Sequence, residues 1–228
     1  MNRSVMLDSF YCQLDALKAI NGFKRLSNCS SRSEWPKRGV YFFFELGEGR
    51  ANSTALRVVR VGTHAVSAGS KTTLWNRLST HRGSLRGTGN HRGSIFRKRV
   101  GESLLAKNND LLKSWGIGTN APKDIRDSEA AHEKLVSAYI GDMPLLWLAI
   151  GDDASAKSER GYIERNAIAL LSNYQKVAVD SPSKGWLGNF SATSTIRESG
   201  LWNTNHVDGA VDPDFLERFS KFVKEMER

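Results

Sequence analysis

Short hydrophobic runs alternate with longer amphipathic stretches along this chain. Residues 40–46 (VYFFFEL), 56–61 (LRVVRV) and 144–150 (PLLWLAI) have the length and hydrophobic content of buried strands. A turn rich in Gly and polar residues separates the first two runs, which predicts an antiparallel hairpin. The pattern therefore predicts a small sheet of three strands.

Apolar residues at helical spacing predict helices around these strands. The helices are expected over residues 6–22, 95–107, 128–140, 158–174 and 212–226, and Thr73 can cap a short helix that ends near Gly83. Residues 181–209 lack such a pattern and are expected to be irregular. We infer an α+β fold, with a three-stranded antiparallel sheet flanked by helices, in a single elaborated domain of residues 1–228.

The composition is that of an ordinary globular protein, with 39% hydrophobic and 25% charged residues among 228. No apolar run approaches the roughly 20 residues that span a bilayer, and the N-terminus lacks an apolar core of signal-peptide length. The two cysteines form no CxxC pair, so neither a disulfide scaffold nor a cysteine zinc site is indicated. We expect a cytoplasmic protein with no membrane partner.

The positive charge is concentrated in one part of the chain. The formal net charge is +9, and residues 49–101 contain many Lys and Arg but no Asp or Glu. A field of one sign attracts polyanions, and solvated surfaces usually intersperse acids, so nucleic-acid binding is favoured over a merely solvated basic face. An anionic membrane surface is the weaker alternative, because the stretch shows no broad apolar helix face.

Several separated residues carry groups suited to phosphate chemistry. Tyr41 lies in the first strand, where a phenol could orient or deprotonate a water, although a strand tyrosine is most often a core residue. Arg77 and His81 are four residues apart and so share a helix face. The guanidinium fork of an arginine suits a phosphate, and a histidine can donate to it or carry a proton. The alternative is a solvated basic pair near a helix C-terminus.

Glu164 lies on a late helix, one turn after Arg160. One interpretation is an ion pair between the two on a solvent-exposed face. The other is a carboxylate that holds Mg²⁺ (or Mn²⁺), which commonly keeps waters and takes phosphate oxygens as further ligands.

Other polar residues are candidates for supporting roles. His64 follows the second strand and could line the same cleft, and Asn173 and Asn189 are alternative structural amides near it. Residues 83–93 form a loop with several glycines, which let a backbone approach phosphates closely. The candidate nucleic-acid contacts are in and around this loop: Arg82, Arg86, His91, Arg92 and Arg97.

The order of these fragments resembles the GIY-YIG nuclease family. Gly39-Val40-Tyr41 is followed by Val61-Gly62 at the end of a second strand, then by Arg77 with His81, and finally by Glu164. The resemblance covers residues 37–190, with an N-terminal helical extension (residues 1–36) and a C-terminal extension (residues 191–228). It implies that the tyrosine assists the attacking water, that the arginine and histidine hold the phosphate, and that the glutamate binds one divalent metal.

The chain also departs from the family's pattern. Arg60 replaces the tyrosine of the second motif, a long insertion separates Arg77 from Glu164, and no asparagine falls at the family's usual spacing. Arg60 either substitutes as a phosphate contact or marks a degenerate site.

The leading hypothesis is a Mg²⁺-dependent endonuclease that hydrolyses phosphodiester bonds in DNA, with RNA as an alternative substrate. A second hypothesis is a non-catalytic nucleic-acid-binding module on the same fold, which Arg60 supports. A third is an enzyme acting on another phosphate ester, against which the wide basic stretch argues. Cleavage of both strands usually requires two active sites, which is compatible with a homodimer.

Overall fold

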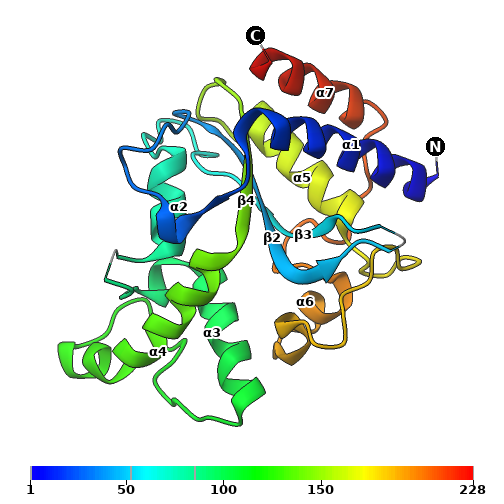
Figure 1. The fold of residues 1–228 in the computed structure, drawn as a ribbon. Coiled ribbons are helices and arrows are strands. Elements are labelled where there is room, and N and C mark those ends of the chain that lie inside the picture. Colours follow the sequence, from blue (N-terminus) through cyan, green and yellow to red (C-terminus); the bar gives the residue numbers. More distant parts are fainter. Residues whose placement is uncertain (1, 52, 85, 228) are drawn as a thin grey trace.

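A four-stranded antiparallel sheet forms the centre of the computed structural model, which describes residues 2–51, 53–84 and 86–227 (Figure 1). The strands are β1 (Lys24–Arg25), β2 (Gly39–Gly49), β3 (Leu56–Gly62) and β4 (Pro144–Ala149), in the spatial order β1-β4-β2-β3. The α+β fold is confirmed, but the prediction of three strands was wrong. The additional strand, β1, has only two residues, too few to show a period of two in the sequence.

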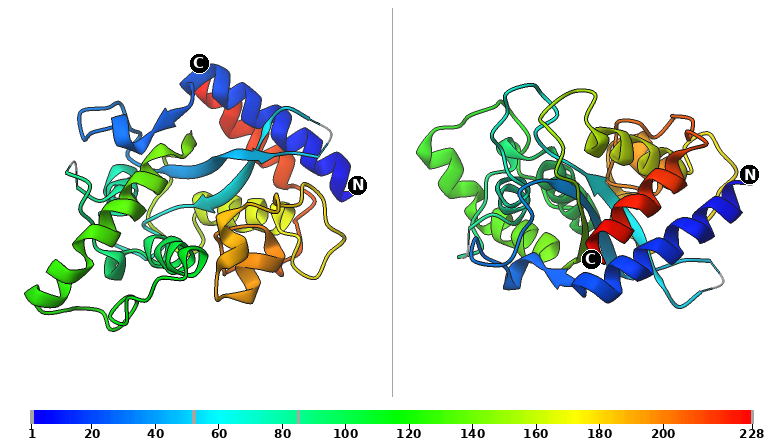
Figure 2. Two further views of the ribbon diagram at one scale, coloured as in Figure 1. Left: turned by 60° about the horizontal axis from the view of Figure 1, so that its bottom comes forward. Right: turned by 90° about the horizontal axis from the view of Figure 1, so that it is seen from above.

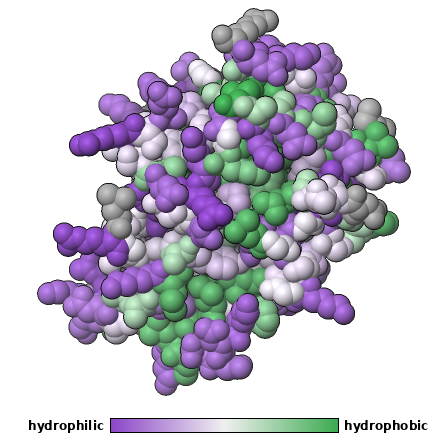
Figure 3. All heavy atoms as spheres, in the orientation of Figure 1, coloured by the Kyte–Doolittle hydropathy of each residue, from purple (hydrophilic) through white to green (hydrophobic). Residues whose placement is uncertain are grey.

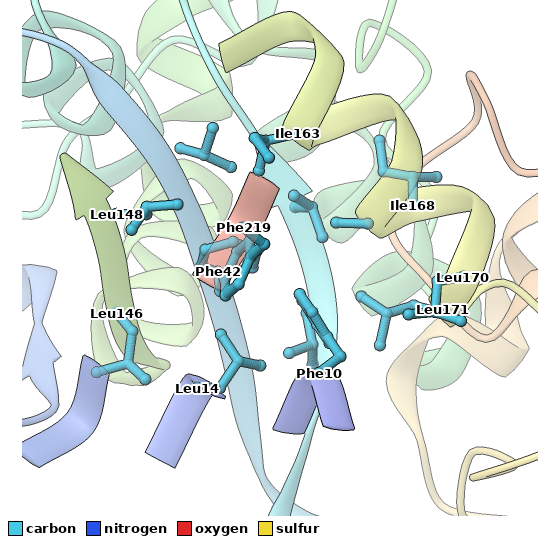
Figure 4. Packing of buried hydrophobic residues seen from close by; sticks show 14 of the residues in the cluster. Phe10, Leu14, Phe42, Leu146, Leu148, Ile163, Ile168, Leu170, Leu171 and Phe219 are labelled. Carbon is cyan, nitrogen blue, oxygen red and sulfur yellow. The ribbon is translucent and has the colours of Figure 1, made fainter. Parts of the chain in front are cut away.

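Strand β2 places alternate side chains into two hydrophobic cores, as expected from the geometry of a strand. Val40, Phe42 and Phe44 face the first core. This core is covered by α1 (Arg3–Asn21), α5 (Glu159–Leu171) and α7 (Phe215–Met226). Figure 4 shows Phe42 among Phe10 and Phe219 from two of these helices.

Tyr41 and Phe43 face the second core on the opposite side of the sheet. The elements on this side are α2 (Leu74–Arg82), α3 (Ile95–Asn108), α4 (Lys123–Asp142), α6 (Ser194–Ser199) and three short 3-10 helices, η1 (Leu26–Asn28), η2 (His91–Gly93) and η3 (Leu187–Phe190). In the left view of Figure 2, α1 and α7 lie on one side of the sheet and α3 and α4 on the other. The segment expected to be irregular therefore includes two short helices, α6 and η3, and its Trp186 and Trp202 belong to the second core.

The two ends of the chain pack against the central sheet. Helices α1 and α7 lie side by side and contribute Leu7, Phe10 and Phe219 to the first core (Figure 2). Near the C-terminus, the backbone N–H of Trp202 donates to the carbonyl of Val59 at 2.8 Å, which partly covers the edge of β3. The division into a nuclease core with two extensions stays a prediction.

The surface is mixed in polarity. Hydrophilic residues cover much of the face in Figure 3, and hydrophobic residues form patches, the broadest in the lower half of the view. Among the described residues, no helix is both long and apolar enough to cross a membrane.

Candidate active site

Tyr41 and His81 form a buried hydrogen-bonded pair between the sheet and α2. Their Oη and Nε2 atoms are 2.8 Å apart, and both side chains are 0% exposed. Thr73 caps α2, as predicted, by accepting a hydrogen bond from the N–H of Asn76 at 3.1 Å. On β3, Gly62 lies directly opposite Tyr41, and any larger side chain there would overlap the phenol. The cap therefore defines the start of the helix that carries His81, and Gly62 leaves the space that the Tyr41 phenol occupies.

Ser94 occupies the other side of the His81 ring. Its Oγ lies 2.9 Å from His81 Nδ1 and also accepts a hydrogen bond from the N–H of Arg97, because Ser94 is the N-cap of α3. Both ring nitrogens of His81 are thus occupied by protein groups. The sequence analysis missed Ser94, although a serine before an amphipathic stretch is a recognised cap signal.

The surroundings of His81 favour its neutral form. Its pKa lies well below the ordinary value, mainly because of burial and further because of the nearby cations Arg60, Arg77 and Arg97. A neutral imidazole has one N–H, so it donates one hydrogen bond and accepts another. His81 therefore connects the hydroxyls of Tyr41 and Ser94 by one bond of each kind.

Glu164 reaches the end of β3 from α5. Its Oε1 accepts a hydrogen bond from the backbone N–H of Thr63 at 3.0 Å. Burial raises its pKa, while Arg60, the Thr63 N–H and Arg77 act in the opposite direction. The alternative interpretation of Glu164, an ion pair with Arg160 on a solvent-exposed face, was wrong, because Arg160 is fully buried and pairs with Asp152.

Arg60 and Arg77 bring positive charge to both Glu164 and His81. Arg60 donates to the carbonyl of Trp202 at 3.1 Å, and its guanidinium lies 4.6 Å from the ring centre of Phe96. The Nε atoms of both arginines are buried without a hydrogen-bond partner among the described residues. Since an unpaired buried donor is costly, such N–H groups favour the binding of an anion.

His64 also has buried nitrogen atoms without a hydrogen-bond partner among the described residues. It is 5% exposed, and neither ring nitrogen has a hydrogen-bond partner in the part of the chain that the structure describes. Its pKa is lowered to about 4 by burial and by nearby arginines, Arg160 first among them. Three residues with unpaired buried nitrogens thus lie around the end of β3 near Glu164.

A family model described as GIY-YIG domain matches residues 1–228. The chain belongs to the GIY-YIG family. No curated protein and no solved structure matches the chain. GIY-YIG proteins are generally nucleases, so the match supports a nuclease-type function in coarse terms.

Four fragments far apart in the sequence meet at one place in this GIY-YIG fold. Tyr41 contacts His81 directly, while Arg77 influences the pKa of both His81 and Glu164. Arg60 influences the same two groups. It therefore adds positive charge beside both His81 and Glu164.

Neither predicted asparagine lies at this cluster. Asn173 Oδ1 accepts hydrogen bonds from Arg3 and from the N–H of Val179, both at 2.9 Å. Asn189 donates to two carbonyls within its own loop. Asn203, which sequence reasoning missed, instead binds both the N–H and the C=O of Val61 on β3, at 3.0 and 2.8 Å.

His91 and Arg97, predicted to contact nucleic acid, are buried at 1% and 0% exposure. The His91 N–H and Nδ1 bind the carboxylate of Glu133, and Arg97 pairs with the same carboxylate. His91 also stacks on Trp115, with ring centres 3.8 Å apart. The structure therefore contradicts their assignment to a nucleic-acid surface, since α4 supplies the anion that they need.

The other three residues predicted to contact nucleic acid differ in their burial and in their partners. The Arg92 side chain is 4% exposed and forms a double hydrogen bond with Glu129 at 2.6 and 2.9 Å, so its assignment is contradicted too. Arg82 donates to the carbonyl of Cys29 and lies 5.0 Å from the ring centre of Trp75. Arg86 is exposed, and its neighbour Leu85 lies outside the described residues.

The donor set fits one hard divalent cation held by a single protein carboxylate. Within residues 2–51, 53–84 and 86–227, no group of three or more His, Cys, Asp or Glu side chains is arranged to hold a metal. Glu164 has one oxygen bound to Thr63 N–H and a second oxygen with no hydrogen bond to a described residue. Mg²⁺ is commonly bound through one or two carboxylates together with waters and substrate phosphate, so Glu164 is compatible with that mode.

Proposed function

We propose that this GIY-YIG protein is a Mg²⁺- or Mn²⁺-dependent endonuclease that hydrolyses phosphodiester bonds in DNA. The observation that carries the proposal is the group of unpaired buried guanidinium N–H donors beside one carboxylate and a tyrosine–histidine pair. Arginines bind phosphate oxygens well because their charge is permanent and their N–H groups form a planar fork.

Arg77 and Arg60 are assigned to the scissile phosphate. Both N–H groups would gain an acceptor when a phosphate oxygen arrives, which relieves an unfavourable state of the free protein. They would also stabilise the additional negative charge of the pentavalent transition state. Glu164 would hold the divalent cation, which supplies Lewis-acid stabilisation of phosphate oxygens and lowers the pKa of bound water.

Tyr41 and His81 are assigned to the attacking water. In the tautomer with the proton on Nδ1, His81 donates to Ser94 Oγ and accepts at Nε2 from the phenol O–H. The phenol oxygen then keeps lone pairs that can accept a hydrogen bond from water and orient it. This makes His81 a positioning residue for Tyr41, whereas the family resemblance had implied a phosphate contact.

A non-catalytic DNA-binding module is the second candidate. It is favoured by the complete burial of Tyr41, whose hydroxyl contacts His81 and not an open cleft, and by Arg60 in the second tyrosine position. Catalysis requires that substrate binding gives water access to this hydroxyl, whereas simple binding requires no such change.

The Arg77→Ala variant distinguishes these candidates in a cleavage assay on a DNA duplex with Mg²⁺. We expect the rate to fall by about 10²–10³, as for the loss of one preorganised electrostatic partner. Arg126→Ala, which removes an exposed arginine on α4, is the matched control and should cleave at the wild-type rate. Equal cleavage by folded Arg77→Ala and wild type would remove Arg77 from the chemistry. If wild-type protein binds the duplex but does not cut it, the binding module is supported.

A further inference from the structure

A groove of about 530 Å³ lies beside the candidate active site and is lined mainly by cationic and small residues. Its walls come from three separate segments: Lys37 and Arg38 before β2, residues 69–71 after β3, and Asp153 with Ala154 after β4. Lys37 and Lys71 are exposed. The single acid, Asp153, has a fully exposed side chain 3.6 Å from Arg38. The groove therefore carries a net positive charge.

His64 lies next to this groove, close to the backbone of Lys37 and to the charge of Arg38. The charged groups that lower its pKa, in addition to burial, are Arg160 from α5, Arg38 from the segment before β2, and Arg77 from α2. Burial and these three cations together favour the neutral imidazole. A neutral imidazole keeps one N–H donor, and here that donor is buried near the backbone of Lys37 but forms no well-aligned hydrogen bond with a described residue.

The same short segment joins the groove to the catalytic groups. The N–H of Thr63 binds Glu164, and the carbonyl of His64, the next residue, accepts a hydrogen bond from Arg160. His64 is thus the residue next to the one that binds Glu164, and its imidazole lies near Lys37 and Arg38 of the basic groove.

We propose that His64 and the groove formed by Lys37, Arg38 and Lys71 bind the phosphates that flank the scissile bond on one side. The ligand class is a nucleic-acid backbone. A metal cation is disfavoured by the surrounding positive charge, whereas cationic side chains on separate walls can each neutralise a backbone phosphate. This inference rests on the proposed function, because it assigns the substrate path of the same site.

The groove is tested by the double variant Lys37→Ala/Lys71→Ala. Binding of a fluorescein-labelled DNA duplex is measured by anisotropy over a range of NaCl concentrations, in EDTA so that no cleavage occurs. Each lost phosphate contact lowers the salt slope by about 0.9, so we expect a decrease of about 2 and weaker binding at low salt. Lys221→Ala/Lys224→Ala, which removes two exposed lysines from α7, should leave the slope unchanged.

An unchanged slope in Lys37→Ala/Lys71→Ala, or an equal decrease in both double variants, would overturn the groove assignment. The two proposals fail separately. If the protein binds DNA through this groove but cuts no substrate, the nuclease proposal is wrong and the groove assignment is retained. A protein that cuts DNA while the groove variant binds normally is a nuclease with another substrate path.

His64 is tested by following its imidazole C–H resonances by NMR during a titration with inorganic phosphate. The resonances are assigned by their loss in His64→Gln. We expect those of His64 to move, while those of exposed His206 stay in place. His64→Gln retains an N–H donor and should keep more DNA affinity than His64→Ala. Stationary His64 resonances, or equal affinities of the two variants and wild type, would remove His64 from the subsite.

Discussion

Gly62→Ala is expected to separate Tyr41 from His81. A methyl group on Gly62 would lie 2.8 Å from Cε2 of Tyr41 and closer still to Cζ and the hydroxyl oxygen. The phenol must retreat by roughly 1 Å to restore ordinary contact distances. Overpacking of this kind costs about 1–3 kcal/mol, and a buried hydrogen-bonding group that loses its partner adds about 1–3 kcal/mol. We expect the variant to lose about 2–6 kcal/mol of stability.

The catalytic consequence follows from the same displacement. A misplacement of about 1 Å can cost on the order of 10² in rate. Stability is measured by urea denaturation, and cleavage of a DNA duplex is measured at a temperature where the variant remains folded. Gly151→Ala is the matched control, because a methyl group there would have no neighbour within 4 Å. If Gly62→Ala matched wild type in both stability and cleavage, the close packing of Tyr41 against Gly62 would not support the site.

Three further predictions concern buried polar groups. Tyr41→Phe should leave His81 Nε2 without a partner, lower stability by about 1–3 kcal/mol in urea denaturation and reduce cleavage strongly; native-rate cleavage would exclude the phenol from catalysis. Glu48→Gln should cost about 3–5 kcal/mol because it leaves the buried Arg57 guanidinium without an anion, and a near-native denaturation midpoint would contradict this. The pKa values of His64 and His81 are both lowered on folding, so below the ordinary value of 6.5 the unfolded chain binds more protons and stability decreases as pH falls toward about 4. Thermal melts between pH 7 and 5 should show this decrease, with a smaller slope in His64→Gln, and an identical slope would refute the contribution of His64.

The strands and helix starts that depend on neighbouring residues could be predicted from the sequence. The length and aromatic content of the hydrophobic run at residues 40–46 predict a buried strand, and Thr73 correctly marks the start of α2. These features depend on neighbouring residues only. Helix boundaries were less well predicted: α4 begins at Lys123 and α7 at Phe215, because the first and last turns lack a distinctive apolar pattern.

The ion pairs between residues far apart in the chain could not be predicted from the sequence. Residues 49–101 contain no acid, which suggested a free basic surface, yet Arg92 and Arg97 pair with Glu129 and Glu133 of α4. These partners lie more than thirty positions away along the chain. A count of charges along the sequence gives no information on which of them are neutralised after folding. Similarly, nothing local to Asn203 indicated that it would bind the edge of β3.

The central proposal is that Glu164 supports metal-dependent phosphodiester hydrolysis. The most direct measurement is cleavage of supercoiled plasmid, with single-stranded DNA in parallel, by wild type and Glu164→Gln in Mg²⁺ or EDTA. The amide oxygen of glutamine can still accept from Thr63 N–H, so the fold should be retained while the metal ligand is lost. We predict cutting only by wild type with Mg²⁺. Equal cutting by folded Glu164→Gln, or cutting by wild type in EDTA, would contradict the proposal.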